Sequence, residues 1–425
     1  MFSTDTRLKI LFVMPPCLPT PPKGYGGIEA VAAALLPELR QQGAHITLTT
    51  PDGSTVKADV KHELTKPLYS RLSHSYNFIS PDIELYVTKV MQLAWDGDFD
   101  IIHDFSGMLT ITNTLAGALP GGQFPAVVQT IHGPIEPFKK HYDSLTKYNQ
   151  LYFTAISNSQ LTDAPNSLRR KTKVIYNGIN PSDFKHGDKG DRLLVLGRLC
   201  SDKGQDQLVD YISNTNMSLD IAGTVAEMST IEEIEHEVSL EQAAKHANHP
   251  DLKLYKQIRP HIDGERIRFY GNVGGKLKQD LLSSASALVM PNRWAEPFGM
   301  VAIEAMASGT PVVAMGTGAL PELVIHGETG YLANSFEELT MYLQPEYINR
   351  LDPHACRNHV KENFSTEAIA KDYMSMYKGI VAKASPSVFT ATAKQASKAS
   401  ILKPVFGEQV IRSTQRKKSG SSDLL

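Results

Sequence analysis

The sequence is poor in cysteine, in long apolar runs and in charge of one sign, and each shortage argues against a class of protein. The three cysteines, Cys17, Cys200 and Cys356, lie far apart and show neither a metal-binding spacing nor a disulfide framework, which fits a reducing cytoplasm. No apolar run approaches the roughly 20 residues that span a bilayer, and the short run at 9–14 leads into prolines, unlike a signal peptide. A formal net charge of −2 argues against a general nucleic-acid binder. We therefore expect a cytoplasmic protein, at most peripheral at the inner membrane surface.

What the sequence does contain is two series of short apolar runs that alternate with helical patterns. The first series predicts strands at 9–14, 44–50, 101–103, 126–130, 152–156 and 173–176. The second predicts strands at 193–196, 219–222, 267–270, 287–290 and 312–314. Such alternation is typical of α/β folds with doubly wound parallel sheets. Two such domains joined by a hinge are expected to bind a ligand between them, at the carboxyl ends of the strands.

Three segments stand apart from this alternation. Residues 226–265 are charged and helical in pattern, and we expect a solvated helical excursion there. A helical stretch at 366–384 ends the folded part. The tail at 385–425 carries seven basic and two acidic side chains among polar residues, and we expect it to be disordered. A weak contact between this basic tail and anionic membrane lipid is a further expectation.

The most informative stretch places two carboxylates, Glu296 and Glu304, on either side of a predicted helix start. Pro297 is suited to the first turn of a helix, and Gly309 ends the helical pattern. We expect Glu296 in the loop before the helix, and Glu304 either buried in its second turn or lining a cleft beside it. Free N–H groups at a helix N-terminus attract anions, so the stretch indicates a ligand that is both hydroxyl-rich and negatively charged, such as a nucleotide sugar.

Two glycine-containing loops are candidates for binding the phosphates of such a ligand. Arg198 and Lys203 lie five residues apart, after the strand at 193–196, and a guanidinium and an ammonium at this spacing can clamp a pyrophosphate. Gly26 and Gly27 lie directly before a predicted helix, where glycines present backbone N–H groups to an anion. Their spacing differs from the G-x-G-x-x-G dinucleotide fingerprint.

Polar residues at strand ends in the first half complete the candidate set. His132 follows the strand at 126–130, although on spacing alone a single histidine is more often structural. His103 and Asp104 end an earlier strand, and we expect them to line the acceptor side of the site. Asp96, Asp98 and Asp100 form an Asp-x-Asp pattern, but acids before a strand are usually solvated, so we expect no bound metal.

The spacing Glu296-x7-Glu304, with Phe298 and Gly299 inside it, resembles the signature of the retaining glycosyltransferases of family 4. The segment 306–314 extends the resemblance. It implies a GT-B fold, in which two doubly wound Rossmann-like domains face each other across a cleft. The implied divisions are an acceptor-side domain at 1–180, a linker at 181–192, a nucleotide-sugar-binding domain at 193–365, a helix at 366–384 that returns to the first domain, and the tail at 385–425.

The resemblance also implies roles for the candidate residues. Arg198 and Lys203 would bind the donor phosphates, with Gly26 and Gly27 beside them. His132 would face the donor sugar, Glu296 would contact its hydroxyls or anomeric region, and Glu304 would bind the ribose hydroxyls. Backbone N–H groups would hold the sugar and phosphates at Phe298, Gly299, Met300 and Val301. The catalytic set is then His132, Glu296, Arg198 and Lys203.

The function that the resemblance implies is transfer of a hexose-type sugar from a nucleotide sugar to a hydroxyl acceptor, with retained anomeric configuration. The acceptor is a glycan, a lipid or a small molecule, and we expect neither a metal nor a cofactor. Two alternatives are open: a sugar-nucleotide epimerase of GT-B fold, and a catalytically silent nucleotide-sugar or glycan-binding protein. A phosphorylase would need a cofactor-bearing lysine site, and a nicotinamide-dependent dehydrogenase would need the glycine fingerprint.

Overall fold

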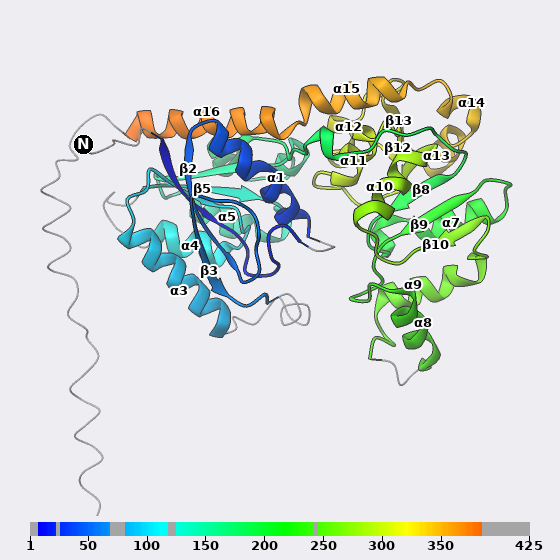
Figure 1. Cartoon of the computed structure of the whole chain (residues 1–425), viewed down its shortest axis with the longest axis horizontal. Coiled ribbons are helices and arrows are strands. Elements are labelled where there is room, and N and C mark those ends of the chain that lie inside the picture. The colour runs from blue at the N-terminus through cyan, green and yellow to red at the C-terminus, as the bar shows by residue number, and fades with distance from the viewer. Residues whose placement is uncertain (1–6, 23–25, 69–80, 118–124, 242–244, 385–425) are drawn as a thin grey trace, which may run out of the picture. The chain divides into compact units, whose positions relative to one another are not determined.

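The computed structural model of the chain describes residues 7–22, 26–68, 81–117, 125–241 and 245–384, and the basic tail at 385–425 lies outside these residues. The described residues form two sheets in which all pairings are parallel (Figure 1), both within one compact unit, Met1–Gly379. The prediction of an α/β fold with doubly wound parallel sheets is confirmed.

The first sheet has seven strands in the order β3-β2-β1-β4-β5-β6-β7. Its strands are β1 Leu8–Val13, β2 Ala44–Pro51, β3 Val60–Thr65, β4 Ile101–Asp104, β5 Ala126–Ile131, β6 Leu151–Ala155 and β7 Thr172–Val174. Its helices are α1 Gly27–Gln41, α3 Pro81–Asp96, α4 Leu109–Gly117, α5 Lys139–Leu145 and α6 Asn166–Lys171. The sequence analysis missed β3, because this edge strand is exposed or half-buried along its length and lacks an apolar run.

The second sheet has six strands in the order β10-β9-β8-β11-β12-β13. Its strands are β8 Leu193–Leu196, β9 Leu219–Ala222, β10 Ile267–Phe269, β11 Ala287–Met290, β12 Val312–Met315 and β13 Gly330–Ala333. The helices after β8 are α7 Gln205–Ser213, α8 Ile231–Ser239, α9 Pro250–Ile258, α10 Gly275–Ser284, α11 Met300–Ala307, α12 Leu320–Leu323, α13 Phe336–Tyr342, α14 Pro345–Ile348, α15 Pro353–Asn363 and α16 Thr366–Ala384. The sequence analysis also missed β13, a short edge strand that begins with glycine.

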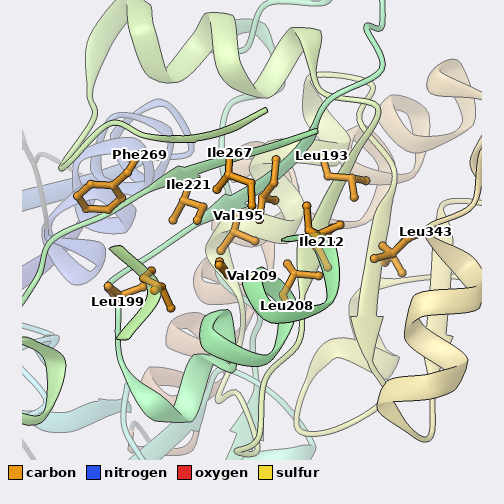
Figure 2. Packing of buried hydrophobic residues seen from close by; sticks show 14 of the residues in the cluster. Leu193, Val195, Leu199, Leu208, Val209, Ile212, Ile221, Ile267, Phe269 and Leu343 are labelled. Atoms are coloured by element: carbon orange, nitrogen blue, oxygen red, sulfur yellow. The ribbon is translucent and has the colours of Figure 1, made fainter. Parts of the chain in front are cut away.

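A core on one face of the second sheet fixes the helices around β8. Figure 2 shows Leu208, Val209 and Ile212 of α7 packed against strand residues such as Val195 and Ile221. These side chains follow the i, i+1, i+4 spacing that puts apolar residues on one face of a helix. Because a buried core residue cannot be moved without opening a cavity, this packing holds the start of α7, and with it the loop after β8, in one position.

The excursion at 226–265 contributes to the same core, contrary to part of our expectation. Helix α8 is mostly exposed, and Ile234 is its buried residue, as predicted for a solvated helix. In α9, however, Leu252, Tyr255 and Ile258 are buried in the core that also contains α7. The prediction of a solvated excursion is therefore wrong for α9, whose apolar spacing of three residues lines one helical face.

Helix α16 contributes two tyrosines to the buried polar centre of the first sheet. The Tyr377 hydroxyl lies 2.6 Å from Nδ1 of His103, and Nε2 of His103 lies 2.8 Å from Oγ1 of Thr130. The Tyr373 hydroxyl is 3.2 Å from the same Thr130 oxygen. Hydrogen bonds therefore connect the last described helix to the ends of β4 and β5.

The expectation that His103 and Asp104 line an acceptor site is wrong, since both side chains are completely buried. Both ring nitrogens of His103 have hydrogen-bond partners, and Asp104 accepts hydrogen bonds from Ser106 and Thr112. Burial lowers the pKa of His103 to about 3 and raises the pKa of Asp104 to about 6. Their role in this structure is to hold the sheet centre together.

The lowered pKa of His103 predicts a pH-dependent contribution to stability. Its ordinary pKa is 6.5, so the unfolded chain gains a proton before the folded chain does, and stability is lost as pH falls from that value. A His103→Asn variant lacks this pH-dependent contribution. We therefore expect the gap in unfolding free energy between wild type and variant to decrease by about 2 kcal/mol as the pH falls from about 7.5 to about 5. Urea unfolding at the two pH values measures the gap. A gap that stays constant would contradict the lowered pKa.

Candidate functional site

The second sheet brings three loops together at one edge. Strands β8, β11 and β12 are neighbours and parallel, so their carboxyl ends lie side by side. The loops that follow them, at 197–204, 291–299 and 316–319, contain five of the residues singled out by the sequence analysis, namely Arg198, Lys203, Glu296, Phe298 and Gly299. This edge is where ligands bind in open parallel sheets.

Glycines allow the backbones of these loops to touch. Gly204 has a φ of 70°, and a Cβ there would lie 2.2 Å from the carbonyl oxygen of Pro291. Gly318 has a φ of 63°, and a Cβ there would lie 2.3 Å from the backbone nitrogen of Glu296. Next to it, the N–H of Ala319 donates a hydrogen bond to the Glu296 carbonyl, at 2.8 Å. The three loops thus form one packed unit that only glycine permits at these two positions.

Lys203 and Glu296, from two of these loops, form an ion pair at the centre of the unit. Both side chains are largely buried, which strengthens their attraction relative to a pair in water. The Asn292 side chain donates a second hydrogen bond to the Glu296 carboxylate, at 2.9 Å, and the Lys203 ammonium lies 5.5 Å from the ring centre of Trp294. The structure thus brings together two of the predicted residues and adds Asn292 and Trp294, which the sequence analysis missed.

The backbone and the side chain of Arg198 are held by different partners. The Gln205 side chain donates to the Arg198 carbonyl at 2.9 Å and accepts from the N–H of Cys200 at 3.3 Å. The guanidinium forms an ion pair with Asp251 of α9, with 3.2 Å between Nη1 and Oδ2. The Arg198 side chain is 49% exposed, so part of it is open to a ligand.

Glu304 lies in the second turn of α11 and is buried, as the sequence predicted. Its partner is Lys278 of α10, whose ammonium lies 2.9 Å from one carboxylate oxygen and 2.8 Å from the other. The predicted helix start is wrong, however, because α11 begins at Met300 and Pro297 lies in the loop before it. Gly299, with a φ of 105°, ends the extended loop and sets the helix start three residues later than the proline indicated.

The residues around the start of α11 have two different roles: Phe298 packs in the interior, whereas Met300 and Val301 form the first turn of the helix. The Phe298 ring is buried against Tyr176 and Phe364, with ring centres 6.1 and 6.3 Å apart. Met300 and Val301 are half-buried and belong to the first turn, whose backbone N–H groups have no partner within the helix. The helix N-terminus is therefore next to Glu296, as an anion site would need.

In the first sheet, His132 and Gly26 lie in loops that follow β5 and β1. Nε2 of His132 donates to the Phe105 carbonyl at 3.1 Å, and desolvation by burial lowers the pKa of His132 to about 4. The imidazole is therefore neutral at pH 7, with the proton on Nε2. Gly26 has a φ of 154° directly before α1, which begins at Gly27, while residues 23–25 of the same loop lie outside the described residues.

Residues that the sequence analysis missed connect β6 to the loops of the second sheet. The Ser157 hydroxyl donates to the carbonyl of Pro297 at 2.7 Å. The Glu322 carboxylate of α12 accepts from the N–H groups of Asn158 at 2.8 Å and Ser159 at 2.7 Å, and from the Tyr176 hydroxyl at 2.9 Å. Burial, and then Glu322, raise the pKa of Tyr176 to about 12. No spacing rule marks Glu322, because its partners lie more than a hundred residues away in the sequence.

Within the described ranges, no group of three or more histidine, cysteine, aspartate or glutamate side chains could hold a metal ion. Two acids of the Asp-x-Asp pattern have local partners in the first sheet. Asp98 forms an ion pair with Lys9 at 3.1 Å, and Asp100 accepts a hydrogen bond from the backbone N–H of Lys9 at 2.8 Å. These contacts hold the turn before β4 against β1.

Comparison with known families agrees with this geometry. The family model described as Glycosyltransferase Family 4 matches residues 25–183, and the one described as Glycosyl transferases group 1 matches residues 179–344. Together they span most of the chain and both sheets. The chain belongs to glycosyltransferase family 4. The second match contains the Arg198–Lys203 loop and the Glu296–Glu304 stretch.

The relatives that match this chain align with it over only part of their length. An uncharacterized glycosyltransferase of Methanocaldococcus jannaschii is 30% identical over 225 residues, which is 50% of this chain and 55% of the relative. The glycogen synthase of Mycobacterium tuberculosis is 29% identical over 238 residues, which is 54% of this chain and 50% of the relative. The chain therefore spans about half the length of the relatives it matches.

Solved structures of low sequence identity share the fold of this chain, which is GT-B. Sucrose-phosphate synthase from Thermosynechococcus elongatus superposes with a TM-score of 0.65 at 20% identity, covering 89% of this chain and all of the other. HepE of Anabaena, solved with UDP-glucose, superposes with a TM-score of 0.62 at 18% identity, covering 88% of this chain and all of the other. The predicted GT-B fold is confirmed. Across the described helices, none is both long and apolar enough to cross a membrane.

The packing of Gly318 against the Glu296 backbone can be tested with a matched pair of variants. In Gly318→Ala the new Cβ must displace Glu296, and we expect a loss of roughly 3 kcal/mol of unfolding free energy from overpacking plus the strained positive φ. Gly327→Ala is the control, because its φ is 80° but nothing lies within 4 Å of a Cβ. We expect this control to lose about 1 kcal/mol, from strain alone. Urea unfolding measures both, and equal losses would show that the contact with Glu296 is unimportant.

Proposed function

We propose that this chain is a retaining glycosyltransferase that moves a hexose-type sugar from a nucleotide sugar to a hydroxyl acceptor without a metal ion. The observation that carries the proposal is the buried Lys203–Glu296 pair at the carboxyl edge of the second sheet, directly before the N-terminus of α11. It combines a fixed cation, a fixed carboxylate and free backbone N–H groups within three neighbouring loops. A nucleotide sugar presents the matching diphosphate and hydroxyl groups.

Arg198 and Lys203 are proposed to bind the donor diphosphate. When the bond between the sugar and the diphosphate breaks, negative charge increases on the departing phosphate. Cations that are already fixed in place stabilise this state more than the intact donor. The loop geometry supports this role, because Gln205 holds the backbone of the loop and Lys203 is largely buried.

Glu296 and His132 are proposed to act on the sugar, and Glu304 on the nucleotide. Lys203 and Asn292 fix the Glu296 carboxylate, which leaves it as an oriented acceptor for sugar hydroxyls. Because the His132 imidazole is neutral, it exerts neither the attraction nor the repulsion of a full charge on the reacting carbon. Glu304, paired with Lys278, is proposed to accept hydrogen bonds from the ribose hydroxyls.

Retention of configuration requires the acceptor oxygen to approach the face of the sugar from which the phosphate leaves. We propose that the departing phosphate oxygen takes the acceptor proton, and that Arg198 and Lys203 neutralise the phosphate where a metal ion would otherwise do so. Glu296 and Glu304 are not proposed as an acid and nucleophile pair, because Glu304 is buried in a helix and already paired with Lys278.

The two alternatives receive less support. The relatives that match include proteins named glycosyltransferase and glycogen synthase, which favours transfer over epimerisation. A silent binding protein is disfavoured because each candidate at the second sheet is present and held by named partners. Structures of HepE contain UDP-glucose and UDP, which supports a nucleotide-sugar donor here as well.

A thermal-shift panel of UDP-, GDP- and ADP-sugars tests the donor proposal. A ligand that binds only the folded state raises the melting temperature, and a hundredfold excess over Kd stabilises by about 2.7 kcal/mol. We expect one nucleotide series to raise the Tm of the wild type and to lose most of that effect in Arg198→Ala. The absence of a shift with every nucleotide sugar would count against the donor proposal and favour a silent glycan-binding protein. Turnover of the donor alone to a second sugar nucleotide would instead identify an epimerase.

Removal of the Lys203 ammonium should slow the reaction more than it weakens binding. We expect Lys203→Ala to lower the rate of donor turnover about 100- to 1,000-fold, as for the loss of one donor to a developing negative charge. Release of nucleoside diphosphate from the donor identified above measures this rate. Lys361→Ala, an exposed residue of α15, is the matched control and should behave as wild type. A similar rate in both variants would remove Lys203 from the proposed machinery.

A further inference from the structure

An ion pair connects the helical excursion to the phosphate-binding loop. Asp251 is the second residue of α9, and its carboxylate lies 3.2 Å from the guanidinium of Arg198. The two side chains differ strongly in exposure, since that of Asp251 is 6% exposed and that of Arg198 is 49% exposed. The buried carboxylate is therefore the fixed member of the pair, and the guanidinium is the one that faces solvent.

The position of Asp251 is set by the start of α9. His249 precedes the helix, and its Nδ1 accepts the backbone N–H of Asp251 at 3.2 Å. Pro250 occupies the first helical position, where a missing N–H has no cost. A carboxylate in the first turn is also stabilised by the helix dipole.

Packing holds α9 itself in place. Leu252 and Tyr255 are buried in the core that contains Leu199, the neighbour of Arg198 in the phosphate loop. The Tyr255 hydroxyl donates to Glu235 of α8 at 2.7 Å, and Arg259 forms an ion pair with the same carboxylate at 2.7 Å. The excursion is thus a rigid support that presents Asp251 to the loop.

Charge and geometry then act on Arg198 in opposite ways. A guanidinium has five N–H donors in a rigid plane, so the contact between Nη1 and Asp251 restricts the direction of the other donors. At the same time the negative charge of Asp251 offsets part of the attraction between Arg198 and an anionic ligand. Asp251 therefore improves the orientation of the Arg198 guanidinium and weakens the binding of an anionic ligand in its ground state.

We propose that Asp251 is a positioning residue of the donor site, which orients the Arg198 guanidinium toward the diphosphate of the nucleotide sugar and moderates its affinity for the nucleoside diphosphate product. The inference rests on the proposed function, because it takes the Arg198 ligand to be a diphosphate. It gives the excursion at 226–265 a function in the site, through α9.

The test is a double-mutant cycle on the full chain, with Asp251→Asn, Arg198→Ala and the double variant. The probe is whichever of UDP, GDP and ADP gives the largest thermal shift, with its Kd measured by titration calorimetry, and turnover is measured as release of that diphosphate from its sugar donor. In Asp251→Asn we expect turnover to fall about tenfold, the size of one misdirected charged hydrogen bond, while Kd stays equal or decreases. In the Arg198→Ala background, Asp251→Asn should change neither quantity.

A second variant separates positioning from general support of the fold. Asp220→Asn weakens a largely buried ion pair between Arg192 and β9, 2.7 Å long in the wild type, that is separate from the Arg198–Asp251 pair, so we expect a lower melting temperature with unchanged turnover and Kd. The melting temperature of ligand-free Asp251→Asn is measured beside it.

The outcomes distinguish the inference from the function on which it rests. If Asp251→Asn slows turnover equally with and without Arg198, or leaves the turnover of the wild type unchanged, the inference is overturned while the donor site stands. A Kd that rises in proportion to the loss of turnover overturns it as well, because a misfolded loop would do the same. If Arg198→Ala leaves the Kd of the diphosphate unchanged, the assignment of the donor site fails, and the inference fails with it.

Discussion

The parallel direction of every strand is the constraint on which the rest of this structure depends. In a parallel sheet all carboxyl ends fall on one edge, so loops that are distant in the sequence become neighbours. Lys203 and Glu296 are 93 residues apart and meet because β8 and β11 are adjacent strands. Gly204 and Gly318 then allow the loop backbones to approach more closely than any side chain would permit. Strand order thus creates the site, and glycine completes it.

Cations and carboxylates occur in pairs throughout this edge. Lys203 pairs with Glu296, Arg198 with Asp251, and Lys278 with Glu304. Pairing reduces the cost of removing each charge from water, and it keeps the side chains oriented before a ligand arrives. Under the proposed function, a bound diphosphate would share cations that are already in position. We propose that the same pairing moderates the attraction for anions and so favours release of a charged product.

Two histidines of the first sheet show how little a strand-end position says about burial. His103 ends β4 and is completely buried between Thr130 and Tyr377, whereas His132 follows β5 and is half-buried beside Phe105. Both are neutral at pH 7 because burial lowers the pKa of each. The difference arises from α16, whose tyrosines cover His103. That helix follows the first sheet by some two hundred residues, so local sequence around the histidines does not reveal it.

The sequence by itself determined most of the strands, though not the edge strands β3 and β13, and most of the candidate residues, since apolar runs of strand length, glycines before helices and the Glu296–Glu304 spacing are local patterns. It placed Glu304 in the second turn of its helix and it located Arg198 and Lys203 in one loop. It misplaced the start of α11 by three residues, because Gly299 outweighs Pro297 there. The tertiary structure alone decided the partners: Asp251 for Arg198, Lys278 for Glu304, and Glu322 for the end of β6. Such pairings depend on which strands and helices become neighbours. The partner of a buried charge must be close in space, but it can be distant in the sequence.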